Sequence, residues 1–170
     1  MPLRNAIINS ALGDLTLVTD GDALSGLYFP GHWYMPSASA LGERVDPGSE
    51  PLFVEARTQL TDYLQRHRAG FVLPIATHGE AFQERVWAIL REIPRGATTT
   101  YGAIAEQLGD TSLAQQVGQA VGRNPVSIVI PCHRVIGANG KLTGYAGGLW
   151  RKRFLLDLEE PAVVASARLF

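Results

Sequence analysis

The pattern of apolar residues changes near Gly79, and this change constrains the fold more than any other feature of the sequence. Before Gly79, turn residues separate short strand-like runs at 6–9, 15–19 and 24–29, and a long helical pattern follows at 51–67. After Gly79 the apolar residues recur at helical spacing in four segments, 81–93, 101–108, 113–123 and 149–159. The chain is therefore predicted to have the α+β fold class.

Two domains are expected on either side of this change. The N-terminal domain, residues 1–78, is predicted to hold a small antiparallel sheet, a helix and a further short strand at 71–73. The C-terminal domain, residues 79–170, contains the four helical segments. No apolar run in the sequence is long enough to cross a bilayer, and Arg4 and Asn5 interrupt any signal-peptide core, so no membrane contact is expected.

The segments 101–108 and 113–123 form a pattern typical of a helix-turn-helix, because two short helices flank a tight turn at Gly109. The second of these helices is rich in small residues and glutamine and has no acidic residue. Its glycines, Gly118 and Gly122, each cost roughly 1 kcal/mol of helix stability relative to alanine. Close approach of another backbone would offset that cost, either in the protein core or on a ligand.

The net charge of −1 hides an uneven distribution of charged residues. Residues 1–80 contain 5 Lys/Arg and 9 Asp/Glu, whereas residues 81–170 contain 10 Lys/Arg and 7 Asp/Glu. No acidic residue lies between Thr111 and Leu156. A basic stretch of this length indicates a surface that meets an anion, and an ordinary solvated surface is the alternative.

Cys132 is the single cysteine of the chain, so it can form neither an internal disulfide nor a cysteine-rich zinc site, and a cytoplasmic protein is expected. It follows Pro131 between apolar runs at 126–130, read as a buried strand, and 135–136, so the chain must turn there. A thiol with a pKa of about 8.5 needs a base or a positive environment to react at neutral pH. His133 could supply one, through a local turn or a bridging water molecule. A small buried hydrophobe is the alternative role for Cys132.

The segment Ile130-Pro-Cys-His-Arg-Val-Ile136 resembles the active-site motif of the O6-alkylguanine-DNA alkyltransferases, or methylated-DNA–protein-cysteine methyltransferases. Other motifs of that family follow the same order: Phe82-Gln-Glu-Arg-Val-Trp87, Ile93-Pro-Arg-Gly96, Thr100-Tyr-Gly-Ala-Ile-Ala105, Asn124-Pro125 and Lys141-Leu-Thr-Gly-Tyr-Ala-Gly-Gly148. The resemblance is strong from about residue 80 to 160. It implies a ribonuclease H-like N-terminal domain and a winged-helix-like C-terminal domain with the helix-turn-helix.

The resemblance also implies a function, which is the repair of double-stranded DNA by direct reversal. Cys132 would take the alkyl group from O6-alkylguanine, and from O4-alkylthymine, irreversibly and once per molecule, after the base flips out through the minor groove. His133 and Glu159 would activate the thiol through a water molecule, Asn124 would hold the turn, and Tyr101 would donate to guanine N3. No cofactor and no metal are implied, and the protein is expected to be a monomer in solution.

The remaining implied site residues form two groups. The base pocket would contain Val135, Leu142, Tyr145, Ala146 and Gly147. The DNA contacts would come from Thr100, Ala114, Gln115, Gln116, Gly118, Gln119, Gly122, Arg123, Arg134, Lys141 and Arg151, with Lys152 and Arg153 as further phosphate contacts. Gln115 stands where the family usually has an arginine that fills the gap left by the flipped base, which predicts weaker flipping.

Two other functions compete with DNA repair by alkyl transfer. A relative that binds lesions without reacting would have lost the cysteine, whereas Cys132 is present. A cysteine hydrolase would need an oxyanion hole and a lasting cysteine–histidine pair, and the sequence gives no separate sign of either.

Overall fold

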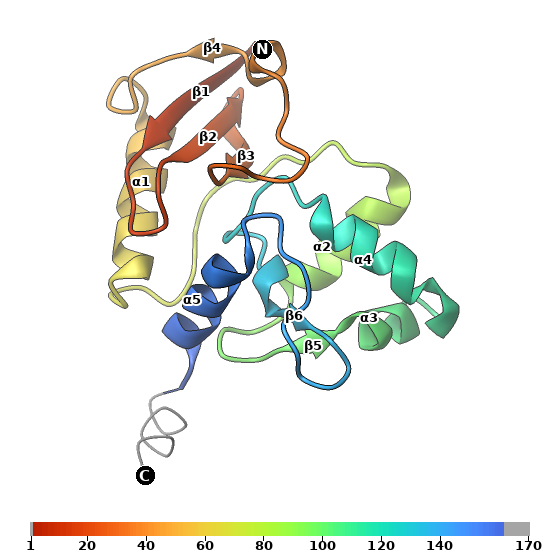
Figure 1. The fold of residues 1–170 in the computed structure, drawn as a ribbon. Helices are drawn as coiled ribbons and strands as arrows, with labels where there is room; N and C mark the ends of the chain where they lie inside the picture. Colours follow the sequence, from red (N-terminus) through yellow and green to blue (C-terminus); the bar gives the residue numbers. More distant parts are fainter. Residues whose placement is uncertain (1, 162–170) are drawn as a thin grey trace.

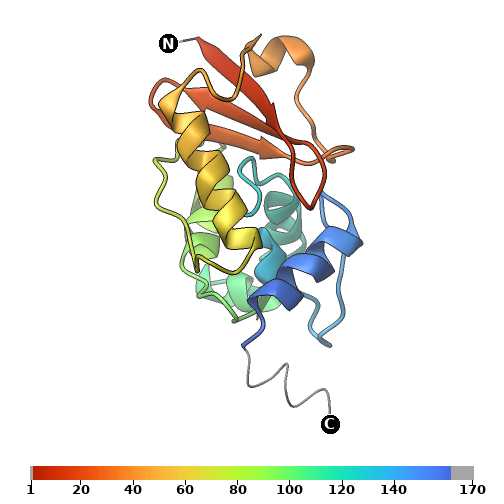
Figure 2. The same ribbon diagram turned by 90° about the vertical axis from the view of Figure 1, so that its left-hand side faces the viewer.

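The computed structural model describes residues 2–161, and its N-terminal part is a sheet covered on one face by a helix (Figures 1 and 2). The strands lie in the order β3-β2-β1-β4. β1 and β2 are antiparallel, as are β2 and β3, whereas β4 is parallel to β1. The predicted antiparallel sheet is therefore correct for three strands, and the unpredicted fourth makes the sheet mixed. The bounds of these elements are β1 Leu3–Ile8, β2 Leu15–Asp20, β3 Ala23–Tyr28, η1 Ala38–Leu41, β4 Glu43–Arg44 and α1 Pro51–Leu64.

Helix α1 packs on the sheet through an apolar face that includes Phe53, Ala56 and Leu60. These side chains recur at three- and four-residue steps, which places them on the same side of the helix. The helix ends three residues earlier than predicted. Arg66 has a φ of 62°, which is left-handed backbone that a helix cannot continue through.

The C-terminal part contains the remaining helices and a two-stranded parallel sheet (Figure 1). Thr100 caps α3 by accepting a hydrogen bond from the Ala103 N–H, and Asp110 caps the next turn in the same way through Ser112. Every helix predicted after Gly79 is present, with ends that differ by two residues at most. The elements are α2 Ala81–Arg91, β5 Thr99–Thr100, α3 Tyr101–Gln107, η2 Thr111–Leu113, α4 Ala114–Gly122, η3 Cys132–Arg134, β6 Val135–Ile136 and α5 Leu149–Glu159.

The open edge of β3 joins the two parts of the chain. The Leu24 N–H donates to the carbonyl of Pro74, and the Leu27 N–H donates to the carbonyl of Pro125. The strand predicted at 71–73 does not form, and Ile75 makes a single bridge to Leu24 instead. Buried apolar residues from both parts belong to one continuous core. The sheet therefore directly supports the segment that leads into Cys132.

The segment 126–130 is buried but is not the strand that its apolar residues predict. Val126 makes a single bridge to Leu27, and Ile128 has a φ of 72°. The Ile130 N–H donates to the Val126 carbonyl at 2.9 Å, which closes a turn. An apolar pattern reports burial, and a compact buried turn produces the same pattern as a buried strand.

Within residues 2–161, the structure contains no helix that is both long enough and apolar enough to span a membrane.

Candidate active site

Cys132 begins the short helix η3, directly after the turn at 126–130, and its side chain is buried. Asn124 holds this turn at both ends. Its Nδ2 donates to the Ile130 carbonyl at 2.8 Å, and its Oδ1 accepts from the Val126 N–H at 3.0 Å. The short helix η3 is the local turn that the sequence predicts after Pro131.

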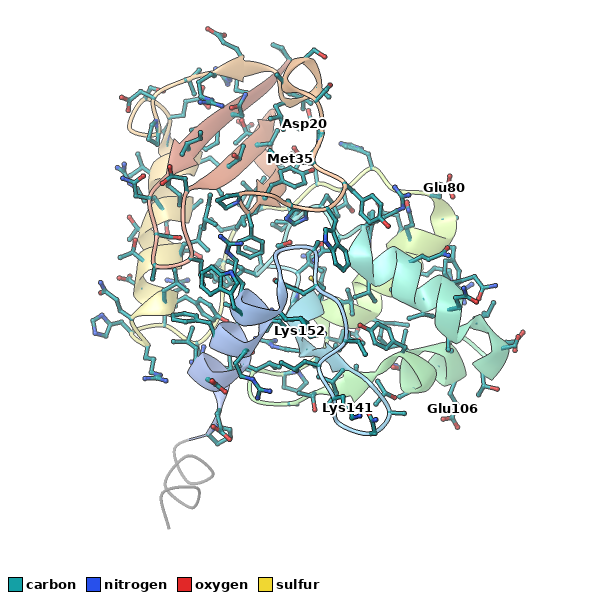
Figure 3. All side chains as sticks on the ribbon, viewed as in Figure 1. Asp20, Met35, Glu80, Glu106, Lys141 and Lys152 are labelled. Atoms are coloured by element: carbon teal, nitrogen blue, oxygen red, sulfur yellow. The ribbon has the colours of Figure 1, made fainter. Side chains whose placement is uncertain are left out.

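The surroundings of the Cys132 thiol act on its pKa in opposite directions. Burial raises the pKa of the thiol, whereas hydrogen bonding to Asn124, the nearby charge of Lys152 and the hydroxyl of Tyr145 lower it. Lys152 was predicted to contact phosphate but is only 1% exposed, and its Nζ donates to the Thr143 carbonyl at 3.3 Å. Figure 3 shows Lys152 inside the molecule and Lys141 at the outer edge of its loop. Burial lowers the pKa of Lys152 to about 8.

His133 follows the thiol and is fully buried beside Glu159. Its Nε2 lies 2.9 Å from Oε1 of Glu159, and an ionised carboxylate only accepts, so Nε2 carries the proton. Burial lowers the pKa of His133 despite the carboxylate, which keeps the ring neutral. Its Nδ1 makes no hydrogen bond to any part of the chain within residues 2–161. The ring thus has an unprotonated nitrogen that can take a proton.

Glu159, at the end of α5, accepts from three side chains, namely His133 and Arg134 of η3 and Tyr63 of α1. Arg134 donates through Nε at 2.9 Å and Nη2 at 2.6 Å, and the Tyr63 hydroxyl of α1 donates at 2.5 Å. Burial alone would raise the pKa of Glu159, but Arg134, His133 and Tyr63 together hold it well below its usual range. Arg134 therefore lies in the interior rather than on the predicted DNA-contacting surface. Tyr63 was not predicted, because no sequence pattern links it to a residue 96 positions away.

A cavity of about 480 Å³ gives Cys132 access to the surface. The Tyr101 hydroxyl, at its edge, hydrogen-bonds Thr143 Oγ1 at 2.8 Å. The residues that line the cavity come from the loop after β3, from α3 and α4, from the turn before Cys132 and from the loop before α5. They are Trp33, Tyr101, Ala114, Gln115, Gly118, Val121, Gly122, Asn124, Ser127, Cys132, Thr143, Gly144, Tyr145 and Ala146. Most of these lining residues belong to the predicted site.

Three predicted pocket residues are absent from this lining. Val135 is buried in the core, and Leu142 lines a separate cavity of about 260 Å³. Gly147 packs so closely on Phe29 that a Cβ there would lie 2.3 Å from the ring. Arg151 is half-buried, and it donates to the carbonyls of Leu12 at 2.7 Å and Gly147 at 2.8 Å. Two of its three guanidinium nitrogens are thus used to hold loops of the protein itself.

The outer face of α4 carries the predicted DNA contacts Gln115, Gln116, Gln119 and Arg123, which are all exposed. Arg123 lies over the Tyr34 ring, 4.0 Å from its centre. A Cβ at Gly118 or Gly122 would meet only ordinary contacts, at 3.7 and 3.8 Å. Packing inside the protein therefore does not require these two glycines, which favours the ligand as the reason for them. Thr100, another predicted contact, is used as the cap of α3.

Within residues 2–161, no three His, Cys, Asp or Glu side chains gather in a way that could hold a metal ion. The fold and the site together define a mixed α+β protein in which a buried cysteine lines a surface cavity beside a pair of short helices.

Comparison with known proteins identifies the family. Residues 81–161 match the family model described as 6-O-methylguanine DNA methyltransferase, DNA binding domain. The chain is 44% identical over 163 residues to the methylated-DNA–protein-cysteine methyltransferase of Mycobacterium tuberculosis, covering 96% of both proteins. It is 43% identical over 155 residues to the protein of the same name from Methanosarcina acetivorans, covering 91% of this chain and 96% of that protein.

Solved structures agree with this result. The crystal structure of Mycobacterium tuberculosis O6-methylguanine methyltransferase matches with a TM-score of 0.83 and 41% identity, covering 96% of this chain and 98% of that chain. Mycobacterium tuberculosis OGT in complex with DNA matches with a TM-score of 0.83 and 43% identity over 92% of each chain. The chain belongs to the methylated-DNA–protein-cysteine methyltransferase family.

Proposed function

We propose that this protein repairs alkylated DNA by transferring the alkyl group of O6-alkylguanine to Cys132 in a single irreversible turnover. The observation that carries the proposal is the buried thiol at a cavity that α3 and α4 also line, with the His133–Glu159 pair behind it. O4-alkylthymine presents the same kind of alkyl–oxygen bond and is included in the proposal. Double-stranded DNA is the partner.

In the reaction, the Cys132 thiolate attacks the alkyl carbon from the side opposite to O6. The new S–C bond forms as the C–O6 bond breaks, and the electron pair of that bond passes to the guanine. The thiol proton goes to Nδ1 of His133, directly or through one water molecule, and Glu159 stabilises the resulting positive charge. A hydrogen bond from Tyr101 to guanine N3 makes the base a better leaving group. The thioether product is stable, so the protein acts once.

DNA binding is proposed to use the outer face of α4. O6 of guanine is inaccessible to a buried thiol while the base is stacked, so the base must flip into the cavity at a cost of a few kcal/mol. The minor groove is roughly 6 Å wide, and a helix with glycine and alanine at its surface can approach it closely. Gln115 on α4 lines the cavity, where it can occupy the space that the base leaves. Lys141 and Arg123 are exposed cations available to phosphates.

The finer description of the protein is also proposed on the family resemblance. Residues 1–78 are proposed as a ribonuclease H-like domain and residues 79–170 as a winged-helix-like domain that carries the chemistry; residues 1 and 162–170 lie outside the part that the structure describes. The protein acts as a monomer in the cytoplasm, and the reaction needs no metal or cofactor, because Cys132 itself receives the alkyl group.

The direct test is to incubate the protein with a duplex carrying one O6-methylguanine and to map the modified peptide by mass spectrometry. We expect a methyl increment on Cys132, with one methyl group per protein molecule. Binding of the duplex without modification would indicate a lesion-binding protein instead. Repeated turnover of an ester or a peptide would indicate a cysteine hydrolase.

Replacing Gly118 with alanine should separate protein stability from DNA binding. The methyl group fits against Tyr101 at ordinary distance, so Gly118→Ala is expected to raise the free energy of unfolding by up to about 1 kcal/mol. The same methyl group keeps α4 from its closest approach to DNA, so affinity should fall several-fold. Urea unfolding and fluorescence anisotropy measure the two effects. Gly102→Ala, in α3 with no neighbour within 4 Å, is the control that should keep its DNA affinity. Unchanged affinity in Gly118→Ala would contradict the proposed role of α4.

Replacing Gln115 with arginine should tighten the binding of lesion-containing DNA. A guanidinium at this position adds a positive charge and a flat group that can stack in the space left by the base, so about a threefold to tenfold gain in affinity is expected. Gln107→Arg adds the same charge at the exposed end of α3 and controls for general attraction to DNA. An equal gain in both variants, or none in Gln115→Arg, would count against the placement of Gln115 at the flipped base.

A further inference from the structure

Trp33 connects the N-terminal part of the chain to the cavity of Cys132. It is the one residue before position 100 that lines this cavity within the described part of the chain. Its side chain is 49% exposed, which is unusual for a large aromatic group and shows that core burial does not account for its position. The sequence analysis assigned it no role.

The backbone around Trp33 is held firmly. The Phe29 N–H donates to Nδ1 of His32 at 3.2 Å, and the rings of Phe29 and His32 stack with their centres 5.8 Å apart. The Trp33 N–H then donates to the Ala146 carbonyl at 3.0 Å, which ties this turn to the loop before α5. The indole is therefore presented to the cavity from a fixed backbone.

The indole also packs tightly against the loop that it faces. A Cβ built on Gly144 would lie 2.6 Å from Cη2 of Trp33, so the two residues are in closer contact than a side chain at 144 would permit. Much of the rest of the lining is small, namely Ala114, Gly118, Gly122, Gly144 and Ala146. Trp33, Tyr101 and Tyr145 are the aromatic residues of this lining. Tyr101 is assigned to the guanine, and Tyr145 is buried beside the thiol, on which its hydroxyl acts. The half-exposed indole is therefore the aromatic group on the solvent side of the cavity, where it bounds the space for whatever the guanine carries.

We propose that Trp33 is a specificity-determining residue whose indole limits the size of the alkyl group that the cavity accepts. We expect a methyl group on O6 to fit beside Cys132 without contact with the indole, and a group of aromatic-ring size to meet it. The inference rests on the proposed function. A pocket wall excludes substrates that are too large for the space beside it. Removing the indole should therefore increase the reaction rate of large alkyl groups more than that of the methyl group.

The test compares two duplexes, one with O6-methylguanine and one with O6-benzylguanine, in wild type, Trp33→Ala and Trp33→Phe. The measured quantity is the second-order rate constant for alkylation of Cys132, followed by intact-protein mass. We expect the benzyl-to-methyl ratio to rise at least about tenfold in Trp33→Ala and by less in Trp33→Phe. Met35→Ala removes another exposed apolar side chain from the same loop (Figure 3) and should match wild type on both substrates.

Free O6-benzylguanine requires no DNA binding, so it tests the cavity alone. Its reaction with Trp33→Ala should accelerate by a similar factor, and a gain confined to the duplex would overturn the inference. An unchanged benzyl-to-methyl ratio in Trp33→Ala would also overturn the inference. If Trp33 only supports the loop, the rates for both duplexes fall together and the ratio stays unchanged. Failure of the wild-type protein to react with the methylated duplex would instead refute the proposed function.

Discussion

A Cys132→Ser variant is expected to transfer no detectable alkyl group, which corresponds to a loss of at least about 1,000-fold in rate. Serine keeps nearly the shape of the side chain, so the turn held by Asn124 and the pair of His133 and Glu159 should remain in place. A hydroxyl group ionises far less readily than a thiol, and the charge of Lys152, which lowers the pKa of the thiol, cannot compensate for that difference.

Two measurements test the Cys132→Ser variant, one of alkyl transfer and one of DNA binding. Transfer is followed by the methyl increment in intact mass, and binding of the O6-methylguanine duplex by fluorescence anisotropy. Affinity should stay within about threefold of wild type, because Cys132 is only 4% exposed and offers little surface to DNA. A lesion-free duplex serves as the control. Methylation of another residue at an undiminished rate would show that the nucleophile has been misassigned.

A Glu159→Gln variant is expected to lose both stability and activity. The carboxylate accepts from His133, Arg134 and Tyr63, so its loss leaves the Arg134 guanidinium buried without its counter-charge. Breaking a buried ion pair on one side costs about 3 to 5 kcal/mol of unfolding free energy. The rate of alkyl transfer should fall by about 100-fold or more, because the proton on His133 is no longer stabilised. Asp157→Asn, an exposed acid on the same helix, is the matched control and should behave as wild type.

The difference in unfolding free energy between wild type and Glu159→Gln should also depend on pH. The pKa of Glu159 in the folded protein lies below its unfolded value of about 4.3, so the ionised carboxylate stabilises the fold above that pH. This stabilisation is lost as the pH falls through and below 4.3. The gap in unfolding free energy between wild type and Glu159→Gln should therefore shrink between about pH 5 and pH 3. Urea unfolding at several pH values measures it, and a gap that stays constant would mean that the charge of Glu159 contributes nothing.

Much of the secondary structure could be predicted because it depends on local patterns. The helix α2 follows from the spacing of Val86 and Leu90, and Gly109 marks the turn after α3. The segment 126–130 was predicted wrongly, since an apolar run gives the same signal in a buried strand and a buried turn. The left-handed backbone at Ile128, which distinguishes the two, leaves no trace in the residue type.

By itself, the sequence determined the α+β class, the helices after Gly79 and the proposal of Cys132 as nucleophile beside His133, because these depend on periodicity, turn residues and one compact motif. Only the tertiary structure decided which cations are available to DNA. Arg134, Lys152 and Arg151 look alike in a basic stretch, yet the first pairs with Glu159 and the other two bond to carbonyls of loops. It also brought Tyr63 and Trp33 to the site. Such contacts join residues up to 139 positions apart, and no local pattern encodes a contact across that distance.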